Sequence, residues 1–282
     1  MKLEDWLKNG EEQLAAGPHP DRARRDAEQL LLHVVRRNRA ALLAHSKEEL
    51  DDTLAARYLA LLGRRLTGEP IQYIFGQTEF YGLPLRVTRD VLIPRPETEH
   101  LVEKVIELAS RYSEPRIVDV GTGSGAIAVA LAHKLPDAHV TAIDLSAAAL
   151  AIAQENAELN GVADRIRFLH GDLLAPVAEE QFDIVVSNPP YVPDADHASL
   201  SVEVRDYEPA QALFAGSDGL SVYRRLIPAA CAVLVSGGWL ALEIGHGQSV
   251  AIRALLAGSG LHPIEFVADL QGIPRVASGR RH

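Results

Sequence analysis

Residues 116 to 125 read Arg116-Ile117-Val118-Asp119-Val120-Gly121-Thr122-Gly123-Ser124-Gly125. The first five residues are rich in β-branched side chains and predict a buried strand. The three glycines that follow allow the backbone to approach a ligand closely. An apolar helix is expected directly afterwards, over Ala126–Lys134, and its free N–H groups would face the loop. This order of strand, glycine loop and helix is typical of the start of an α/β nucleotide-binding unit.

The chain beyond this loop alternates between strand and helix patterns. Strands are expected over residues 140–143, 166–169, 182–187, 239–244 and 263–267, and a turn at 269–276 leads into a terminal strand. Helices are expected from Ser146, a cap, to Asn160 before Gly161, and over residues 223–235 and 250–257. Such alternation predicts an α/β fold with a largely parallel, doubly wound sheet.

Polar residues follow three of the predicted strands. Asp144 ends the second strand and suits the two hydroxyls of a ribose. Asp119 lies just before the glycine loop, where it can help to place a cationic amino-acid tail. Asp172 and Leu173 follow the third strand and suit an adenine. With Ala126 the loop also satisfies the dinucleotide fingerprint, so alone it does not separate a nicotinamide cofactor from S-adenosylmethionine. A tight turn with capping residues is the structural alternative.

A second polar stretch, Asn188-Pro189-Pro190-Tyr191, follows the apolar run of residues 182–187. Asn188 is therefore expected at the carboxyl end of a strand, where open α/β sheets bind ligands. A residue before proline is held in extended geometry, so the Asn188 side-chain oxygen and the Pro189 carbonyl form two acceptors in a fixed arrangement. Tyr191 adds a flat wall, and the group suits a planar –NH2. The alternative is a proline-rich turn.

Composition limits the classes of function. The chain has 282 residues, 47% of them hydrophobic, and a formal net charge of -10. The acidic balance argues against a stable complex with long nucleic acid, since polyanion-binding proteins usually carry a basic face. The single cysteine, Cys231, excludes an intrachain disulfide and fits a reducing compartment. No signal-peptide core and no apolar span of membrane length are present, so a cytoplasmic protein without a membrane partner is expected.

Residues 1–70 are expected to form a helical module, because their apolar residues recur at helical spacing. A capping box at Ser46-Lys47-Glu48-Glu49 predicts the start of one of its helices. The module holds 12 Lys and Arg against 12 Asp and Glu, so the whole negative excess lies in the remainder. Six arginines gather at positions 22, 24, 25, 36, 37 and 39. They either contact a macromolecular substrate or form a solvated helix face.

Residues 71–90 are expected to connect the module to the α/β part. Residues 71–76 and 80–87 are short β-rich runs broken by glycine, and they predict a β-hairpin. Pro94-Arg95-Pro96-Glu97-Thr98 then precedes a helix over residues 99–108. The acidic groups with histidine at 97–103 and 194–197 match no metal signature, so no metal is expected. Hydrolase elbows, Walker loops and zinc-protease motifs are absent from the sequence.

Several of these motifs together resemble one family. The spacing of Asp119, the glycine loop, Asp144 and Asn188-Pro189-Pro190-Tyr191 is similar to that of class I S-adenosylmethionine-dependent methyltransferases acting on amide or amine nitrogens. Further stretches resemble the peptide chain release factor glutamine-N5 methyltransferases (the HemK/PrmC family). They are Glu69-Pro70-Ile71-Gln72-Tyr73-Ile74-Phe75-Gly76, Phe80-Tyr81-Gly82, Leu92-Ile93-Pro94-Arg95-Pro96-Glu97-Thr98-Glu99, Tyr207-Glu208-Pro209, Gly216-Ser217-Asp218-Gly219-Leu220 and Leu242-Glu243-Ile244-Gly245. The resemblance covers nearly the whole chain.

The resemblance implies a fold, a reaction and a set of site residues. The fold would be a Rossmann-like methyltransferase sheet at 91–282, with a substrate-recognising helical domain at 1–70 and a β-hairpin at 71–90. The reaction would methylate, with S-adenosylmethionine, the glutamine of the Gly-Gly-Gln motif in class 1 release factors. The cofactor would contact Asp119, Gly121, Thr122, Gly123, Ser124, Gly125, Asp144, Asp172, Leu173 and Asn188. Asn188, Pro189, Pro190 and Tyr191 would hold the glutamine, with Asn188, Pro189 and Tyr191 acting in catalysis.

Other reactions use the same chemistry. A glutamine of a ribosomal protein, or the amino group of adenine or cytosine in nucleic acid, also presents a planar –NH2 group to the proline loop. A nicotinamide oxidoreductase or a non-catalytic nucleotide-binding module would use the glycine loop but leaves the proline loop without a role.

Overall fold

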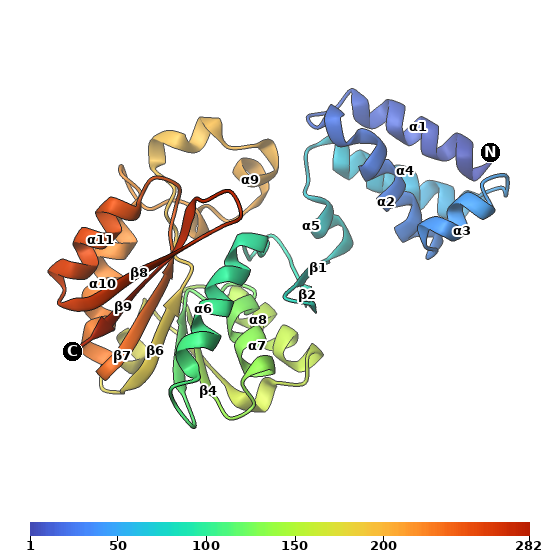
Figure 1. Ribbon diagram of the computed structural model, residues 1–282. Coiled ribbons are helices and arrows are strands. Elements are labelled where there is room, and N and C mark those ends of the chain that lie inside the picture. The colour runs from blue at the N-terminus through green and yellow to red at the C-terminus, as the bar shows by residue number, and fades with distance from the viewer. The chain divides into compact units, whose positions relative to one another are not determined.

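The computed structural model describes all residues, 1–282, and the chain forms two compact units (Figure 1). One unit consists of Met1–Gly76 together with Leu200–Tyr207. The other consists of Gln77–Ser199 and Glu208–His282. The first is helical and the second is α/β, and each has its own buried core. No helix of the chain has the length and apolar character needed to cross a membrane.

The α/β unit is built on one seven-stranded sheet, in the order β5-β4-β3-β6-β7-β9-β8. Its strands are β3 (Arg116–Val120), β4 (His139–Asp144), β5 (Ile166–His170), β6 (Phe182–Ser187), β7 (Leu234–Glu243), β8 (Leu261–Ala268) and β9 (Pro274–Arg281). The strands β3 to β7 pair in parallel, and β9 runs antiparallel to both β7 and β8. The predicted largely parallel sheet is confirmed.

Helices cover both faces of this sheet (Figure 1). They are α6 (Glu99–Ala109), α7 (Ala126–Lys134), α8 (Ala147–Leu159), α10 (Ser221–Val233) and α11 (Ser249–Gly258). Successive strand side chains point to opposite faces. Thus Ile117 packs with α6 and α7, whereas its neighbour Val118 packs with α10 and α11. Burial on both faces explains why these strands are apolar throughout.

The strand order reverses between β3 and β6, and this position brings the two chemical motifs together. From β3 the chain crosses to β4 on one side, whereas β6 lies on the other side of β3. Asp119 pairs with Val186 in the register of β3 and β6. Two residues further along each strand, Gly121 is therefore level with Asn188. Ligands of doubly wound sheets bind at such a reversal, beyond the carboxyl ends of the strands.

The hairpin is present, but its first arm lies further along the chain than predicted. The strands are β1 (Gln77–Phe80) and β2 (Leu83–Arg86), which pair in antiparallel fashion. The preceding run, Ile71–Phe75, is not a strand but the short helix α5. Pro70 stands before its first residue, Gly76 ends it with a φ of 71°, and Tyr73 and Ile74 are buried. Packing of these two side chains overrides the β-propensity of the run.

The helical unit contains α1 (Leu3–Ala15), α2 (Ala23–Val35), α3 (Arg39–Ala44), α4 (Asp52–Leu66) and α5. Buried leucines of α2 and α4 pack around Tyr58, whose hydroxyl donates to the Ala27 carbonyl at 3.2 Å. The predicted capping box at Ser46 is wrong. Helix α4 begins at Asp52, and the Asp51 side chain accepts from the Leu54 N–H at 2.9 Å. Asp51 is an equally good capping residue and stands closer to the apolar run.

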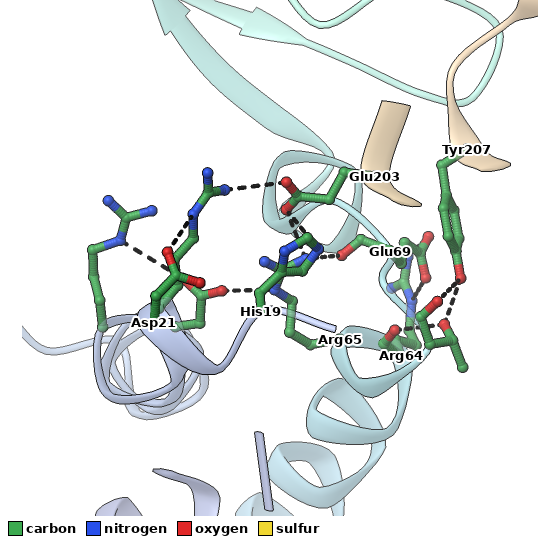
Figure 2. Close-up of polar contacts among 11 residues, drawn as sticks. His19, Asp21, Arg64, Arg65, Glu69, Glu203 and Tyr207 are labelled. Atoms are coloured by element: carbon green, nitrogen blue, oxygen red, sulfur yellow. Dashed lines mark hydrogen bonds and ion pairs between the residues drawn. The ribbon is translucent and has the colours of Figure 1, made fainter. Parts of the chain in front are cut away.

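A segment from the second half of the chain completes the helical unit. Leu200–Tyr207 includes the short helix α9 (Val202–Tyr207), and Figure 2 shows Glu203 and Tyr207 pointing toward residues of the first 70. Glu203 accepts from Arg65 at 2.8 Å, and Tyr207 donates to the Thr67 carbonyl at 2.9 Å. A Cβ added to Gly68 would lie 2.5 Å from Val202.

The arginine cluster is largely neutralised within this unit. Five of the six arginines form ion pairs with carboxylates: Arg22 with Glu203, Arg24 with Glu11, Arg25 with Asp26, Arg37 with Glu48 and Arg39 with Glu28. This pairing favours the solvated helix face over an unbalanced cationic surface.

Candidate active site

A cavity of about 200 Å³ lies at the carboxyl ends of β3, β4, β5 and β6. Among the predicted site residues, its lining contains Gly121, Gly123, Asp144, Asp172, Leu173, Asn188 and Pro190. A smaller hollow shares Gly121, Gly123 and Asn188 with it and adds Thr122 and Ser124. The structure therefore brings the glycine loop, the two aspartates and the proline loop to one place. A larger hollow at Arg116 and His139 lies at the opposite ends of the strands and contains none of them.

The glycine loop turns with its backbone open toward the cavity. Gly121, Gly123 and Gly125 have φ values of 73°, 56° and 79°. A Cβ at Gly125 would lie 3.0 Å from the Ala153 Cβ, so the loop packs directly on α8 there. At Gly121 and Gly123 a Cβ would meet nothing within 4 Å, which is the open side that a ligand can approach. Gly125 therefore has a packing role, whereas the family resemblance predicted that it contacts the cofactor.

Asp144 links the loop to the next helix. One carboxylate oxygen accepts from the Gly123 N–H at 2.8 Å, and the other accepts from the Ser146 N–H at 2.8 Å. These bonds fix the carboxylate at the cavity wall, and each oxygen retains lone-pair capacity for a further donor. Such a carboxylate can accept from a pair of ligand hydroxyls.

Asp172 and Leu173 lie at the far end of the cavity from Asn188 along the sheet, after β5. Leu173 has a φ of 49°, an uncommon conformation for a leucine. Asp172 forms an ion pair with Arg225 of α10, and both side chains are about half exposed. Arg225 is a cavity residue that the sequence did not reveal, because an arginine on an amphipathic helix carries no local signal of a site.

Asp119 is fully buried behind the glycine loop. Its Oδ2 accepts from the Thr122 hydroxyl at 2.7 Å, whereas Oδ1 is buried without a partner. Burial raises the pKa of the Asp119 carboxyl to about 7; the Thr122 hydroxyl and the Ala128 N–H oppose this rise, and the nearby Asp144 charge adds to it. A buried acceptor without a partner, next to an open backbone loop, fits a cationic ligand group.

This burial predicts a pH dependence of stability for the ligand-free protein. Between pH 4 and 7 the folded protein holds a proton on Asp119 that the unfolded chain has released. The free energy of unfolding should therefore fall as pH rises through this window, by on the order of 1 kcal/mol per pH unit from this group. The isosteric Asp119→Asn variant should lose this component. Denaturant titrations of both proteins at pH 5 and pH 8 measure it, and parallel pH profiles would contradict it.

Asn188 directs one side of its amide away from the cavity. Its Nδ2 donates to the Thr98 hydroxyl at 3.1 Å, and the side chain is half-buried. The oxygen of the same amide accepts no hydrogen bond within the chain. Asn188 lines both hollows, so it stands where they join. The –NH2 group of Asn188 is therefore used within the chain, and the side-chain oxygen is left as the predicted acceptor.

Tyr191 is held at both its ring and its backbone. Its hydroxyl donates to Glu243 at 3.4 Å, and its carbonyl accepts from the Gln248 Nε2 at 3.0 Å. Burial and the Glu243 charge raise the pKa of the Tyr191 hydroxyl, so it stays protonated at physiological pH. Pro189 is buried, while Pro190 lines the main cavity. Tyr191 and Pro189 are thus beside the cavity residues rather than among them.

The residues 1–282 contain no cluster of three His, Cys, Asp or Glu side chains that could hold a metal ion. The sequence missed several cavity residues besides Arg225, namely Asp90, Val91, Leu92, Gln211, Ala212 and Val222. Leu92 lies within a stretch that resembles the family motif, so this resemblance was the available signal. The others come from loops and a helix face whose place is set by the tertiary fold.

Comparison with known proteins gives matches over the whole chain. Residues 97–206 match the family model "Methyltransferase small domain", and residues 5–76 match "PrmC N-terminal domain". A protein of Moorella thermoacetica named "Release factor glutamine methyltransferase" is 45% identical over 267 residues, 95% of this chain and 94% of that protein. Proteins with the same name from Geobacter sulfurreducens and Koribacter versatilis are 40% and 41% identical over 99% and 100% of this chain, and over 95% and 99% of theirs.

Solved structures share the fold at lower identity. The hMettl16 catalytic domain, in complex with a MAT2A 3'UTR hairpin, matches with a TM-score of 0.60 and 18% identity, over 86% of this chain and 85% of that chain. The T. thermophilus 16S rRNA methyltransferase RsmC, in complex with AdoMet and guanosine, matches with a TM-score of 0.54 and 19% identity, over 73% and 50%. Both likenesses concern the fold alone.

Proposed function

This chain belongs to the release factor glutamine methyltransferase family, and we propose that it transfers a methyl group from S-adenosylmethionine to a glutamine of a class 1 peptide chain release factor. The acceptor would be the side-chain amide nitrogen of the glutamine in the Gly-Gly-Gln motif. One observation carries the proposal. The open glycine loop and the side-chain oxygen of Asn188 line the same cavity, at the point where the strand order reverses.

The cavity residues fit S-adenosylmethionine by their chemistry. Asp144 would accept from the ribose hydroxyls, and Asp172 with Leu173 would hold the adenine. The buried, unpartnered Oδ1 of Asp119 behind the loop suits the cationic end of the methionine moiety. The open backbone of Gly121 and Gly123, with Thr122 and Ser124 in the adjoining hollow, would line its path. Gly125 would support this loop from its contact with α8.

The acceptor amide is a weak nucleophile, because its nitrogen lone pair is delocalised into the carbonyl. S-adenosylmethionine supplies a methyl group already activated by the sulfonium, so positioning and electrostatics carry the catalysis. We assign to the Asn188 Oδ1 and the Pro189 carbonyl the two hydrogens of the glutamine –NH2. These acceptors aim the nitrogen and stabilise the positive charge that develops on it. Tyr191 and Pro190 pack beside the amide, and the proton leaves after transfer.

We assign substrate recognition to the helical part, predicted as residues 1–70, and the chemistry to the α/β part after the 71–90 connector. The separate match of residues 5–76 to its own family model supports such a division. A reducing, cytoplasmic setting agrees with a release factor as the substrate. The two acceptors at Asn188 and Pro189 would suit any planar –NH2 group. The choice of glutamine as the substrate therefore depends on family membership.

Mass spectrometry tests the proposal. The purified protein is incubated with S-adenosylmethionine and a purified class 1 release factor, and the peptide with the Gly-Gly-Gln motif is analysed. A single added methyl on that glutamine is expected. Parallel incubations with ribosomal protein, DNA and RNA cover the other planar –NH2 substrates, and methylation confined to one of them would overturn the proposal. Calorimetry with S-adenosylmethionine and with NAD separates a methyltransferase from a nicotinamide enzyme.

A further inference from the structure

We propose that Thr98 and Glu243 are positioning residues that determine which side of the Asn188 amide faces the cavity. The proposal rests on the function proposed above, in which the Asn188 oxygen must accept from the substrate –NH2. Neither residue would touch the substrate. Each would act through Asn188, because the order of donors and acceptors in their hydrogen bonds fixes the orientation of the Asn188 amide.

The sheet register places Glu243 beside Asn188. In the pairing of β6 with β7, Ser187 is opposite Leu242, so the next residues along, Asn188 and Glu243, are level with each other. Thr98 reaches the same place from the turn before α6. Both Thr98 and Glu243 are buried, with 4% and 2% of their surface exposed. Glu243 is thus a buried carboxylate beside a residue that lines the cavity, without a cationic partner in hydrogen-bond contact, and such a group calls for an explanation.

When Glu243 is ionised, the donors and acceptors form a chain with only one consistent direction. Asn188 Nδ2 donates to the Thr98 oxygen at 3.1 Å. The Thr98 hydrogen is then free, and the Thr98 hydroxyl is one of the groups that lower the pKa of the Glu243 carboxyl, which is the effect of a donor directed at the carboxylate. An ionised carboxylate only accepts, so it forces Thr98 to donate toward Glu243 and to accept from Asn188. Turning the Asn188 amide over would place two acceptors face to face, and the oxygen is thereby kept on the cavity side.

The same carboxylate holds the other end of the proline loop. The Tyr191 hydroxyl donates to Glu243 Oε1 at 3.4 Å, while Oε2 is buried without a partner. Glu243 thus connects to both Asn188 and Tyr191, the first and last residues of the stretch. The backbone carbonyl of Glu243 in turn accepts from the Tyr223 hydroxyl at 2.7 Å, which anchors the backbone of this residue to α10.

Conditions for the test follow from the surroundings of Glu243. Burial raises its pKa to about 7; Thr98, Tyr191 and Arg275 oppose the rise, and Glu97 adds to it. At pH 8 the carboxylate is therefore mostly ionised, and all variants are compared at that pH. Glu243→Gln presents an –NH2 that donates to Thr98 and reverses the chain. Thr98→Val removes the hydroxyl at nearly constant volume, whereas Thr98→Ser keeps it.

Turnover at saturating substrates is the first measurement. Thr98→Val and Glu243→Gln should lower kcat about 10- to 100-fold, the cost of a misplaced reacting group. Thr98→Ser should stay within about threefold of the wild type, and the dissociation constant for S-adenosylmethionine should change less than about threefold in all three. The matched control is Thr141→Val, another buried threonine, which lies on β4 beside the hollow at the opposite ends of the strands.

Side-chain amide exchange is the second measurement and does not depend on turnover. The Asn188 Nδ2 hydrogens, assigned in ¹⁵N spectra by their absence from Asn188→Ala, should exchange faster with solvent in Thr98→Val and Glu243→Gln than in wild type and Thr98→Ser. Unchanged exchange together with unchanged kcat overturns the positioning roles. The positioning roles are also overturned if Thr98→Ser loses activity and cofactor affinity like the other two variants, because this pattern means a structural role. Failure of the wild type to methylate any release factor instead overturns the proposed function, and amide exchange still decides the positioning.

Discussion

Asn188→Ala is expected to lower kcat for release factor methylation about 100- to 1000-fold, the usual cost of losing one fixed group that stabilises developing charge. The variant loses the Oδ1 acceptor, while the glycine loop, Asp144 and Asp172 stay in place. Binding of S-adenosylmethionine should therefore be largely retained. Single-turnover rates with the purified release factor, together with calorimetric titration of the cofactor, separate the two effects.

The matched control for Asn188→Ala is Gln181→Ala. Gln181 also carries a side-chain amide, it is exposed, and it precedes β6 at the end of the strand opposite Asn188. Its removal should leave kcat and cofactor affinity unchanged. Near-normal turnover of Asn188→Ala would show that the amide hydrogens of the substrate are not held by this side chain, and the proposed mechanism would then be wrong.

Arg65→Ala is expected to lower the free energy of unfolding by about 3–5 kcal/mol, because it removes the buried cation that bridges the carboxylates of Asp26 and Glu203 and leaves them only the more exposed Arg25 and Arg22. Arg65 is 3% exposed and donates to Asp26 at 2.7 Å, to Glu203 at 2.8 Å and to the Glu69 carbonyl at 3.0 Å (Figure 2). Asp26 is itself 2% exposed. Urea denaturation followed by circular dichroism measures the change.

Arg24→Ala is the control for the effect of burial. Arg24 pairs with Glu11 at 2.7 Å, the same distance as Arg65 to Asp26, but its side chain is 65% exposed. Exposed pairs contribute about 0–1 kcal/mol, so this variant should unfold almost like the wild type. Equal losses in the two variants would mean that burial is not what makes the Arg65 cluster important.

Local patterns were sufficient to predict the sheet and its two motifs. Strand β6 ends at Ser187 as expected, because the apolar run and the proline pair are adjacent in sequence. Helix α7 likewise begins and ends at the predicted residues, between Gly125 and the chain reversal after Lys134. The fold class and methyltransferase activity were recognisable from the glycine loop, Asp144 and the proline loop, and the family from further stretches that resemble it; the comparisons support all three.

Features that depend on distant residues were not predictable. Residues 71–75 form a helix because Tyr73 and Ile74 are buried there, and their β-propensity does not report this burial. The meeting of Thr98, Asn188 and Glu243 follows from strand register and helix placement, which no short stretch encodes. The passage of Leu200–Tyr207 into the helical unit is of the same kind, since nothing in its composition indicates its partner.

The capture of α9 has a consequence for how the protein folds during synthesis. Residues 1–76 leave the ribosome first, yet Arg65 lacks Glu203 until the chain has grown past residue 207. At about 5–20 residues per second, this delay is on the order of 10 seconds. The earliest-made unit thus cannot be completed before strand β6 and Asn188, which follows it, have been translated. The chain between the two parts of the helical unit, residues 77–199, contains the glycine loop and Asn188, so the order of synthesis and the order of folding differ.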